Sequence, residues 1–432
     1  MIENKRIAHY IKEVCGQIKN KEVHPAITLE LENHFAEKIE DYREAGYGED
    51  EATRIAVAEM GDPVDVGRYL HQAHKPRMEW GILAIVGILL GVGLLVLYSL
   101  QIAQDEQKWL ERQVNGILIG AVALVAILFS DYSNLKRYSR LLYVATLLLL
   151  LFTLSFGGTV NNIPHLDIRV EELNVFYISP FLLIVAIAGI FTEWKENGRF
   201  TIMKAIALFM PPCYLLLSVH QEYSIIMFFI GYVTLLIAFQ ANWRAVLSFL
   251  GMSLFIIIGK YYLFATQQEL DRFFYFLNPY SDSTGKGYQT IQSMETIQSA
   301  GLWGHGFGST MDTLPALESN YIFVYLVHSL GLIAGASIFI LGIVLLVRLL
   351  LTIKQVKDLY GSMLLSGITT LFFTPFFWSI FMTMGLVPYA NVYLPLVSYG
   401  NGITQLVLQM ALIGLVLNIY RRKDIQPLIK AS

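Results

Sequence analysis

The chain has 432 residues, of which 55% are hydrophobic and only 15% are charged, and its formal net charge is −3. Because soluble globular domains carry about 25% charged residues, most of this chain is expected to lie in a membrane. The net charge by itself says nothing about nucleic acid, but no basic block lies outside short loops, so no nucleic-acid partner is expected. The two cysteines, Cys15 and Cys213, are too far apart in sequence to predict a paired-cysteine metal site.

The first 76 residues are hydrophilic and predict a small soluble helical bundle. Apolar residues recur at helical spacing from Ile27 to Phe35, and the glycines of AGYGEDEA end that helix. A second helix is predicted over about residues 49–60. Asp62 followed by Pro63 has the pattern of an N-cap and the first residue of a further helix.

The same region is similar to a known domain. The stretch ELENHFAEKIEDYREAGYGEDEATRIAVAEMGDP resembles the HAAS-type, or permease prefix, domain, and the resemblance covers about residues 5–72. It implies that residues 1–76 are a cytoplasmic adaptor or regulatory module with a partner of its own, rather than an enzyme. The alternative is a solvated bundle whose charges only keep it soluble.

From residue 77 to residue 432, apolar stretches dominate the sequence. A helix that crosses a bilayer needs ~20 mostly apolar residues, and about ten stretches have that character. They span residues 81–100, 114–130, 139–157, 174–192, 201–219, 223–240, 245–266, 320–350, 359–386 and 401–420. The sequence therefore predicts an all-α polytopic membrane protein with about ten transmembrane helices and a soluble N-terminal bundle.

Basic residues predict the orientation of these helices. The loops on the side of the N-terminal bundle contain Lys136, Arg137, Lys195, Arg244 and Arg348, whereas the opposite loops contain fewer lysines and arginines. Basic loops stay on the cytoplasmic side, and an even number of crossings returns the chain to its starting side. We therefore expect a multi-pass protein of the bacterial plasma membrane with both termini in the cytoplasm.

One connection is much longer than the others, at about residues 267–319 between the seventh and eighth predicted helices. It is rich in aromatic residues, so we expect it to be ordered, and ordered loops of this length are usually functional. The sequence GLWGHGFG surrounds His305 with glycines, which let backbone N–H groups approach an anion. A simple surface turn is the alternative.

Charged residues in this extracytoplasmic loop also allow two interpretations. Arg272, Lys286 and His305 offer positive charge to a phosphate group. Alternatively, they balance nearby acidic residues such as Asp282 and Glu295.

The polar residues Glu318, Ser319 and Asn320 lead directly into the apolar eighth helix. A chemical site at a membrane surface would have this pattern. An ordinary helix start, in which Ser319 or Asn320 caps the first turn, would have it too.

Four segments carry a second resemblance, in the order RFFYFLNPYSDSTGKGYQTIQS, GLWGHGFG, LPALESNYIFVYLVHSLGLIAG and LPLVSYGNG. They resemble the SEDS family of FtsW, RodA and SpoVE, over roughly residues 80–423. The resemblance implies a membrane protein of peptidoglycan synthesis, cell division and cell shape that handles lipid II, an undecaprenyl-pyrophosphate lipid. It also implies a transpeptidase partner of the class B penicillin-binding type. The implied activity is glycan polymerisation outside the membrane, and a lipid II flippase is the alternative.

The resemblance assigns roles to particular residues. The family's catalytic aspartate, in the motif LPExHTDFIF, corresponds to Asn320, and the family's histidine corresponds to Glu318. Candidate substrate-binding residues in the matching segments are Arg272, Asp282, Lys286, Gln292, His305, Ser398 and Tyr399.

An asparagine at the catalytic position changes the expected chemistry. Glycan polymerisation needs a base that takes a proton from the attacking sugar hydroxyl, and a neutral carboxamide cannot accept that proton, although it can still hydrogen-bond to substrate. We therefore predict a diverged paralogue with weak or no glycosyltransferase activity. The alternative is an active enzyme in which Glu318 supplies the base. No cofactor or metal site is predicted, although a divalent cation such as Mg²⁺ or Mn²⁺ would suit pyrophosphate chemistry.

Overall fold

The computed structural model describes most of the chain. The described residues are 5–19, 21–73, 78–104, 108–160, 163–168, 171–196, 202–219, 222–264, 274–399 and 403–423. They divide into two compact units, the first built on residues 1–78 and the second on most of residues 79–419. Each unit is described by itself.

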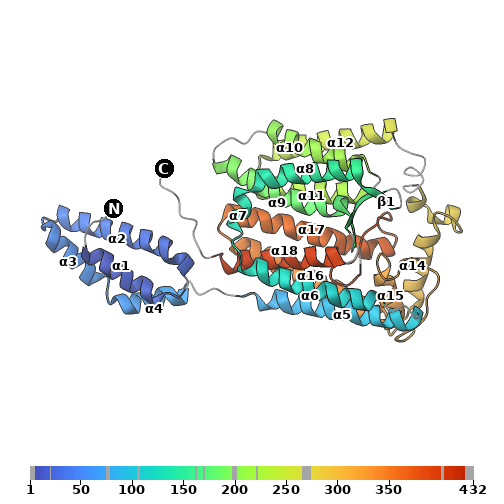
Figure 1. The fold of residues 1–432 in the computed structure, drawn as a ribbon, viewed down its shortest axis with the longest axis horizontal. Coiled ribbons are helices and arrows are strands. Elements are labelled where there is room, and N and C mark those ends of the chain that lie inside the picture. Colours follow the sequence, from blue (N-terminus) through green and yellow to red (C-terminus); the bar gives the residue numbers. More distant parts are fainter. Residues whose placement is uncertain are drawn as a thin grey trace. The chain divides into compact units, whose positions relative to one another are not determined.

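The first unit is a bundle of four helices (Figure 1), which are α1 (Lys5–Gln17), α2 (His24–Glu44), α3 (Glu49–Glu59) and α4 (Pro63–Ala73). Their apolar faces form a separate core, in which the rings of Tyr10 and Phe35 meet edge to face at 5.4 Å. The Asp62 carboxylate accepts the backbone N–H of Val64 at 2.7 Å. The predicted N-cap of the fourth helix is therefore confirmed.

The second unit contains the apolar helices. Among the described residues, seven helices are long and apolar enough to cross a membrane, and three more are apolar but shorter. The seven are α5 (Trp80–Gln104), α6 (Lys108–Phe129), α8 (Ser139–Phe156), α9 (Val175–Glu196), α16 (Leu332–Gln355), α17 (Leu359–Thr383) and α18 (Ile403–Arg421). The three are α10 (Ile202–Leu217), α11 (Glu222–Ala238) and α12 (Trp243–Phe264), in which the apolar stretch counted is Trp243–Phe255. The prediction of a predominantly helical polytopic membrane protein is confirmed, and seven of the ten apolar helices meet the length and hydropathy of a membrane span among the described residues.

The helix α9 lies at the centre of this unit, in contact with α8, α11 and α17. Of its apolar stretch, 89% is buried, against 28% for the stretches in α6 and α16. A helix that is apolar on all sides is buried by other helices or by lipid. The exposed apolar faces of α6 and α16 are therefore the surfaces that lipid tails would cover.

The predicted eighth helix is not continuous, as the apolar pattern over residues 320–350 suggested. It is broken at Gly331 into α15 (Ile322–Leu330) and α16, and Gly331 has a φ of 87°. A Cβ atom there would lie 2.2 Å from the carbonyl oxygen of Leu302. Glycine therefore provides both the left-handed backbone and the space for a neighbouring loop.

The long connection before α15 has secondary structure of its own. It contains the 3-10 turn η2 (Pro279–Asp282) and the helix α14 (Tyr288–Ser299). The Ser293 hydroxyl donates to the carbonyl oxygen of Thr383 at 3.1 Å and fastens α14 to the end of α17. The predicted ordered loop thus contains a docked helix, and Figure 1 shows α14 and α15 at the same end of the unit.

A small antiparallel sheet between α8 and α9 was not predicted. Its strands are β1 (Gly158–Val160), β2 (Ile163–Ile168) and β3 (Glu171–Leu173), in the order β1-β2-β3. The strands are too short to produce a clear alternating pattern in the sequence, so the helix-to-helix connection hid them. Figure 1 shows β1 at the same end of the unit as α14.

Candidate active site around Asn320

The site is built around the turn that precedes α15. Asn320 is 4% exposed, and its side-chain nitrogen donates to the Tyr389 hydroxyl at 2.8 Å and to the Asn391 side-chain oxygen at 3.0 Å. The helix begins only at Ile322, and its N-cap, Tyr321, makes no side-chain capping bond. The interpretation of Asn320 as a helix cap is therefore wrong, because its amide is turned toward the loop that follows α17.

Aromatic rings line this amide. The rings of Tyr321 and Tyr389 stack at 6.2 Å, and the Tyr321 hydroxyl donates to the side-chain oxygen of Gln289 on α14 at 3.2 Å. Burial, with a smaller contribution from Tyr389, raises the pKa of Tyr321 well above its usual range. The Tyr321 hydroxyl thus stays protonated and serves as a hydrogen-bond donor rather than as a base.

The second part of the site is the segment that precedes α18. The backbone N–H of Tyr399 donates to the carbonyl oxygen of Glu318 at 3.0 Å, which joins this segment to the Asn320 turn. The Arg112 guanidinium of α6 donates to the Tyr399 hydroxyl at 3.2 Å. Ser398 is buried, and both its N–H and its hydroxyl donate to the carbonyl oxygen of Leu394. Ser398 therefore shapes the segment, while Tyr399 and Arg112 present polar groups beside it.

Two residues next to the site have a left-handed backbone that side chains rarely adopt. Ala316 has a φ of 53° and Leu396 a φ of 66°. The carbonyl oxygen of Ala316 accepts the N–H groups of Ser319 and Tyr321, and the N–H of Leu396 donates to the buried side chain of Gln409 on α18. Such conformations cost about 1–3 kcal/mol each and cluster at functional sites. The surrounding hydrogen bonds hold both turns in place.

Glu318 lies in the turn and not on a helix. Its side chain is half-buried, and among the described residues its carboxylate makes no hydrogen bond. Tyr393 has a raised pKa chiefly because it is buried, and the negative charge of Glu318 adds to that shift. The Glu318 carboxylate therefore lies near the loop that contains Tyr393. Glu318 is two residues from Asn320 in sequence, but the Asn320 side chain bonds to Tyr389 and Asn391 and not to Glu318.

The remaining candidates of the long loop are engaged elsewhere. The Asp282 carboxylate accepts the N–H of Lys286 at 3.1 Å, and the Lys286 ammonium lies 5.4 Å from the centre of the Tyr275 ring. The side chain of Gln292 donates to Glu295 at 3.0 Å. Arg272 lies outside the described residues. The Asn320 amide donates to Tyr389 and Asn391, and not to Asp282, Lys286 or Gln292. The residue of α14 that reaches the site is Gln289, through its bond with Tyr321.

The glycine-rich loop is fixed to the end of α15. The N–H groups of His305 and Gly306 donate to the carbonyl oxygens of His328 and Ser329 at 2.8 and 3.1 Å. The N–H of Gly308 donates to the Ser99 hydroxyl of α5 at 2.9 Å. These three donors are thus already used, which argues against a phosphate cradle made by the loop.

The ring of His305 lies at the far end of α15 from the Asn320 turn. It stacks on the ring of His328 with 4.4 Å between the ring centres. His328 is six residues beyond Ile322, the first residue of α15, which is roughly 9 Å of helix at 1.5 Å per residue. His305 and Asn320 therefore do not share one phosphate-sized site.

Sequence reasoning missed four site residues: Arg112, Gln289, Tyr389 and Asn391. Gln289 lies within the segment RFFYFLNPYSDSTGKGYQTIQS that carries the family resemblance, so that resemblance was a signal for it. Arg112, Tyr389 and Asn391 lie outside the four segments of the resemblance. Within the described part of the chain, no group of three His, Cys, Asp or Glu side chains is placed to hold a metal ion.

The chain matches the model of the cell cycle protein family, FtsW/RodA/SpoVE, over residues 78–425. It belongs to this family. Stage V sporulation protein E of Bacillus subtilis is 28% identical over an alignment of 360 residues, which covers 79% of this chain and 96% of that protein. Peptidoglycan glycosyltransferase MrdB of Escherichia coli is 26% identical over 357 residues, with 81% and 95% covered.

Two solved structures share the fold of this family member. A chain from a peptidoglycan synthase complex has a TM-score of 0.68 at 20% identity, covering 81% of this chain and 99% of its own. The rod shape determining protein RodA of Thermus thermophilus has a TM-score of 0.60 at 19% identity, covering 81% and 98%. The predicted SEDS membership is therefore confirmed. Residues 1–77 lie outside the family match, and their HAAS-type resemblance stays a prediction.

Proposed function

We propose that this protein is a diverged FtsW/RodA/SpoVE-type membrane protein that binds lipid II, or a related undecaprenyl-pyrophosphate lipid, with weak or no glycosyltransferase activity. The observation that carries the proposal is the buried carboxamide of Asn320 at the position where the family motif has its catalytic aspartate. The rest of the site remains polar and ordered around that amide. Binding without efficient chemistry is the expected result.

The contacts of Asn320 explain why its amide is a poor substitute for a base. Its nitrogen is the donor toward both Tyr389 and Asn391, and an amide nitrogen has no lone pair to take a proton. A carboxylate at this position could accept a hydrogen bond from the Tyr389 hydroxyl. It could also accept one from the Asn391 side-chain nitrogen if the Asn391 amide were rotated by 180°. The pocket is therefore compatible with an aspartate, and loss of a general base typically costs about 10²–10⁴-fold in rate.

A second candidate is an active polymerase that uses Glu318. It is favoured by the position of Glu318 in a turn, where a carboxylate without a hydrogen-bond partner in the described part of the chain can reorient. It is weakened by the absence of a direct link between this carboxylate and the polar cluster of Asn320, Tyr389 and Asn391. A lipid II flippase rests on the polytopic architecture alone.

The remaining parts of the proposal concern orientation and partners. The lysine and arginine distribution supports cytoplasmic termini in the bacterial plasma membrane, with the Asn320 site on the outer side. The bundle of residues 1–76 is proposed as a HAAS-type cytoplasmic module with its own partner. A class B penicillin-binding-type transpeptidase is the proposed partner of the membrane unit.

The test is glycan polymerisation and lipid binding by the purified protein with labelled lipid II. We expect binding with little or no glycan product. Strong polymerisation that disappears in Glu318→Gln would establish the second candidate instead. Absence of both binding and product would contradict the proposal that this site still recognises the lipid.

A further inference from the structure

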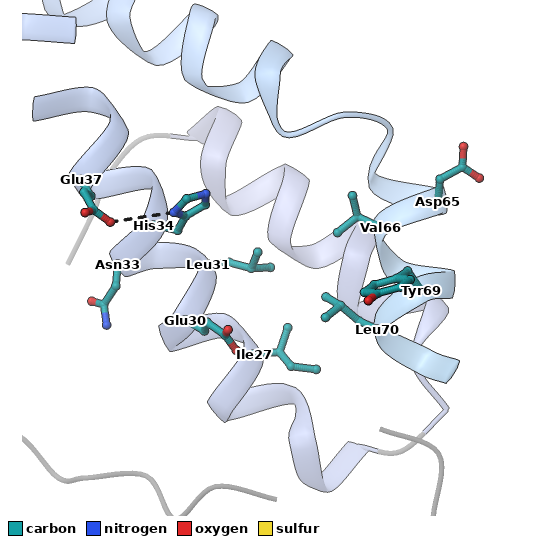
Figure 2. A pocket seen from close by; sticks show the side chains of 10 residues that line it. All are labelled: Ile27, Glu30, Leu31, Asn33, His34, Glu37, Asp65, Val66, Tyr69 and Leu70. Carbon is teal, nitrogen blue, oxygen red and sulfur yellow. Dashed lines mark ion pairs between the residues drawn. The ribbon is translucent and has the colours of Figure 1, made fainter. Parts of the chain in front are cut away.

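A groove on the N-terminal bundle has no role in the proposed chemistry. It has a volume of about 690 Å³ and lies between α2 and α4, outside the family match, which begins at residue 78. Figure 2 shows the side chains of Ile27 and Leu31 from α2 turned toward those of Val66 and Leu70 from α4. Tyr69 stands at the groove with 74% of its surface exposed. An apolar floor of this kind suits the apolar face of a peptide.

The rim of the groove is acidic. Glu30 and Glu37 of α2 and Asp65 of α4 line it, and no lysine or arginine is among its lining residues. Asp65 lies 3.4 Å from Arg68, and Glu37 lies 4.0 Å from the ring of His34. Glu30 is exposed at this rim. The groove therefore favours an occupant with apolar side chains and positive charge.

The C-terminal tail of the same chain has this composition. Its sequence RRKDIQPLIKAS, over residues 421–432, contains four basic side chains and one acidic side chain. Its apolar residues include Ile425, Pro427, Leu428 and Ile429. We propose that this tail docks in the groove between α2 and α4, with its basic residues against Glu30 and Glu37.

Topology and chain length favour an intramolecular contact. About ten apolar helices separate the bundle from the tail, and an even number of crossings brings both to one side of the membrane. The nine residues after Lys423 reach at most about 30 Å when extended. A short tether gives an effective concentration in the millimolar range, so a weak intrinsic affinity is enough for occupancy.

Docking would connect the bundle to the Asn320 site through α18. This helix ends at Arg421, where the tail begins, and near its start the Gln409 side chain accepts the N–H of Leu396 in the site segment. Capture of the tail would thus act on a helix that supports the site. The bundle would then be a regulatory element for the membrane unit, independent of whether that unit is catalytic.

The experiment uses the full-length protein with Cys15 and Cys213 replaced by serine and new cysteines at Tyr69 and Leu428. A short bifunctional maleimide measures how often these two positions meet. We expect an efficient cross-link within one chain. The double change Glu30→Lys and Glu37→Lys should lower the cross-linked fraction about fivefold or more, because it replaces attraction with repulsion.

Charge reversal on the other side provides the decisive control. Arg421→Glu with Arg422→Glu should also lower the fraction, and combining both reversals should restore it, which an unfolded bundle would not allow. Glu40→Lys with Glu44→Lys changes the same charge at exposed positions of α2 outside the groove, and should leave the fraction within about twofold. An unchanged fraction after groove reversal, an equal loss in this control, or cross-links only between differently tagged chains would overturn the proposal.

Discussion

The glycine-rich loop of residues 301–308 and the Asn320 turn of residues 317–321 lie at the two ends of α15 and differ in how they use hydrogen bonds. In the glycine-rich loop, backbone N–H groups bind the last carbonyl oxygens of α15. In the Asn320 turn, a buried side chain donates to polar side chains of another segment. The first arrangement stabilises the break between α15 and α16. The second holds polar groups that can meet a ligand, so glycine content alone does not identify the site.

The largest expected effect is on the stability of the loop. Gly331→Ala would place a methyl group against the Leu302 carbonyl oxygen and force alanine into a φ of 87°. We expect a loss of about 3 kcal/mol or more, or failure to fold, measured as the melting temperature of the purified protein. The matched control is Gly301→Ala, which has a φ of 66° but open space around it, and should cost about 1 kcal/mol. Equal losses would show that the close packing at Gly331 contributes nothing.

The second prediction concerns Tyr389, whose hydroxyl bonds to the side chain of Asn320. In an Asn320→Asp background, Tyr389→Phe removes the hydroxyl that would donate to the new carboxylate. A hydrogen bond to a charged group contributes about 1.5–3 kcal/mol, so glycan polymerisation should fall about 10-fold or more. Tyr321→Phe is the control, because its hydroxyl bonds to Gln289 and not to residue 320. If both changes lower polymerisation equally, the Tyr389 hydroxyl does not support the carboxylate at position 320 more than Tyr321 does.

Arg112 is expected to affect binding rather than chemistry. Its guanidinium lies beside the Tyr399 hydroxyl, where it can bind a pyrophosphate group by two hydrogen bonds. Arg112→Ala should weaken binding of labelled lipid II about tenfold, with the loss reduced at high salt. Arg112→Lys should recover only part of the affinity. Unchanged binding in Arg112→Ala would exclude this side chain from the lipid site.

The smallest effect is expected at His305. Its backbone N–H is held by α15, and its exposed ring stacks on His328. His305→Ala keeps the backbone contacts, so lipid II binding should change less than about twofold, the size of a surface substitution. A loss of lipid II binding as large as that of Arg112→Ala would indicate that the glycine-rich loop does contact the phosphate groups of the lipid.

The sequence predicted those features of the fold that depend on local residues alone. Long apolar stretches predicted the membrane helices, because ~20 apolar residues in a row have few other solutions, and Asp62 predicted its own helix start. The break at Gly331 escaped prediction, because the apolar pattern continues through it. The break depends on contact with the loop at Leu302, which lies 29 residues before Gly331 in the chain. Such tertiary contacts override the local helical pattern.

The candidate site was predictable only in part. Family resemblance located Asn320 and the segment containing Tyr399, but not the geometry that joins them. The partners of Asn320 lie 69 and 71 residues away in sequence, and Tyr399 meets an arginine 287 residues away. Such contacts follow from how the helices pack, and no local spacing encodes them.

The most direct test of the proposal that Asn320 leaves the site without a base compares the natural protein with Asn320→Asp in one polymerisation assay with labelled lipid II. We expect little or no glycan from the natural protein and a gain of about 10²–10⁴-fold from the variant, the usual contribution of a general base. Asn320→Ala should stay inactive and shows whether any gain needs the carboxylate. Strong polymerisation by the natural protein that Asn320→Asp does not increase would contradict the claim that the asparagine limits its chemistry.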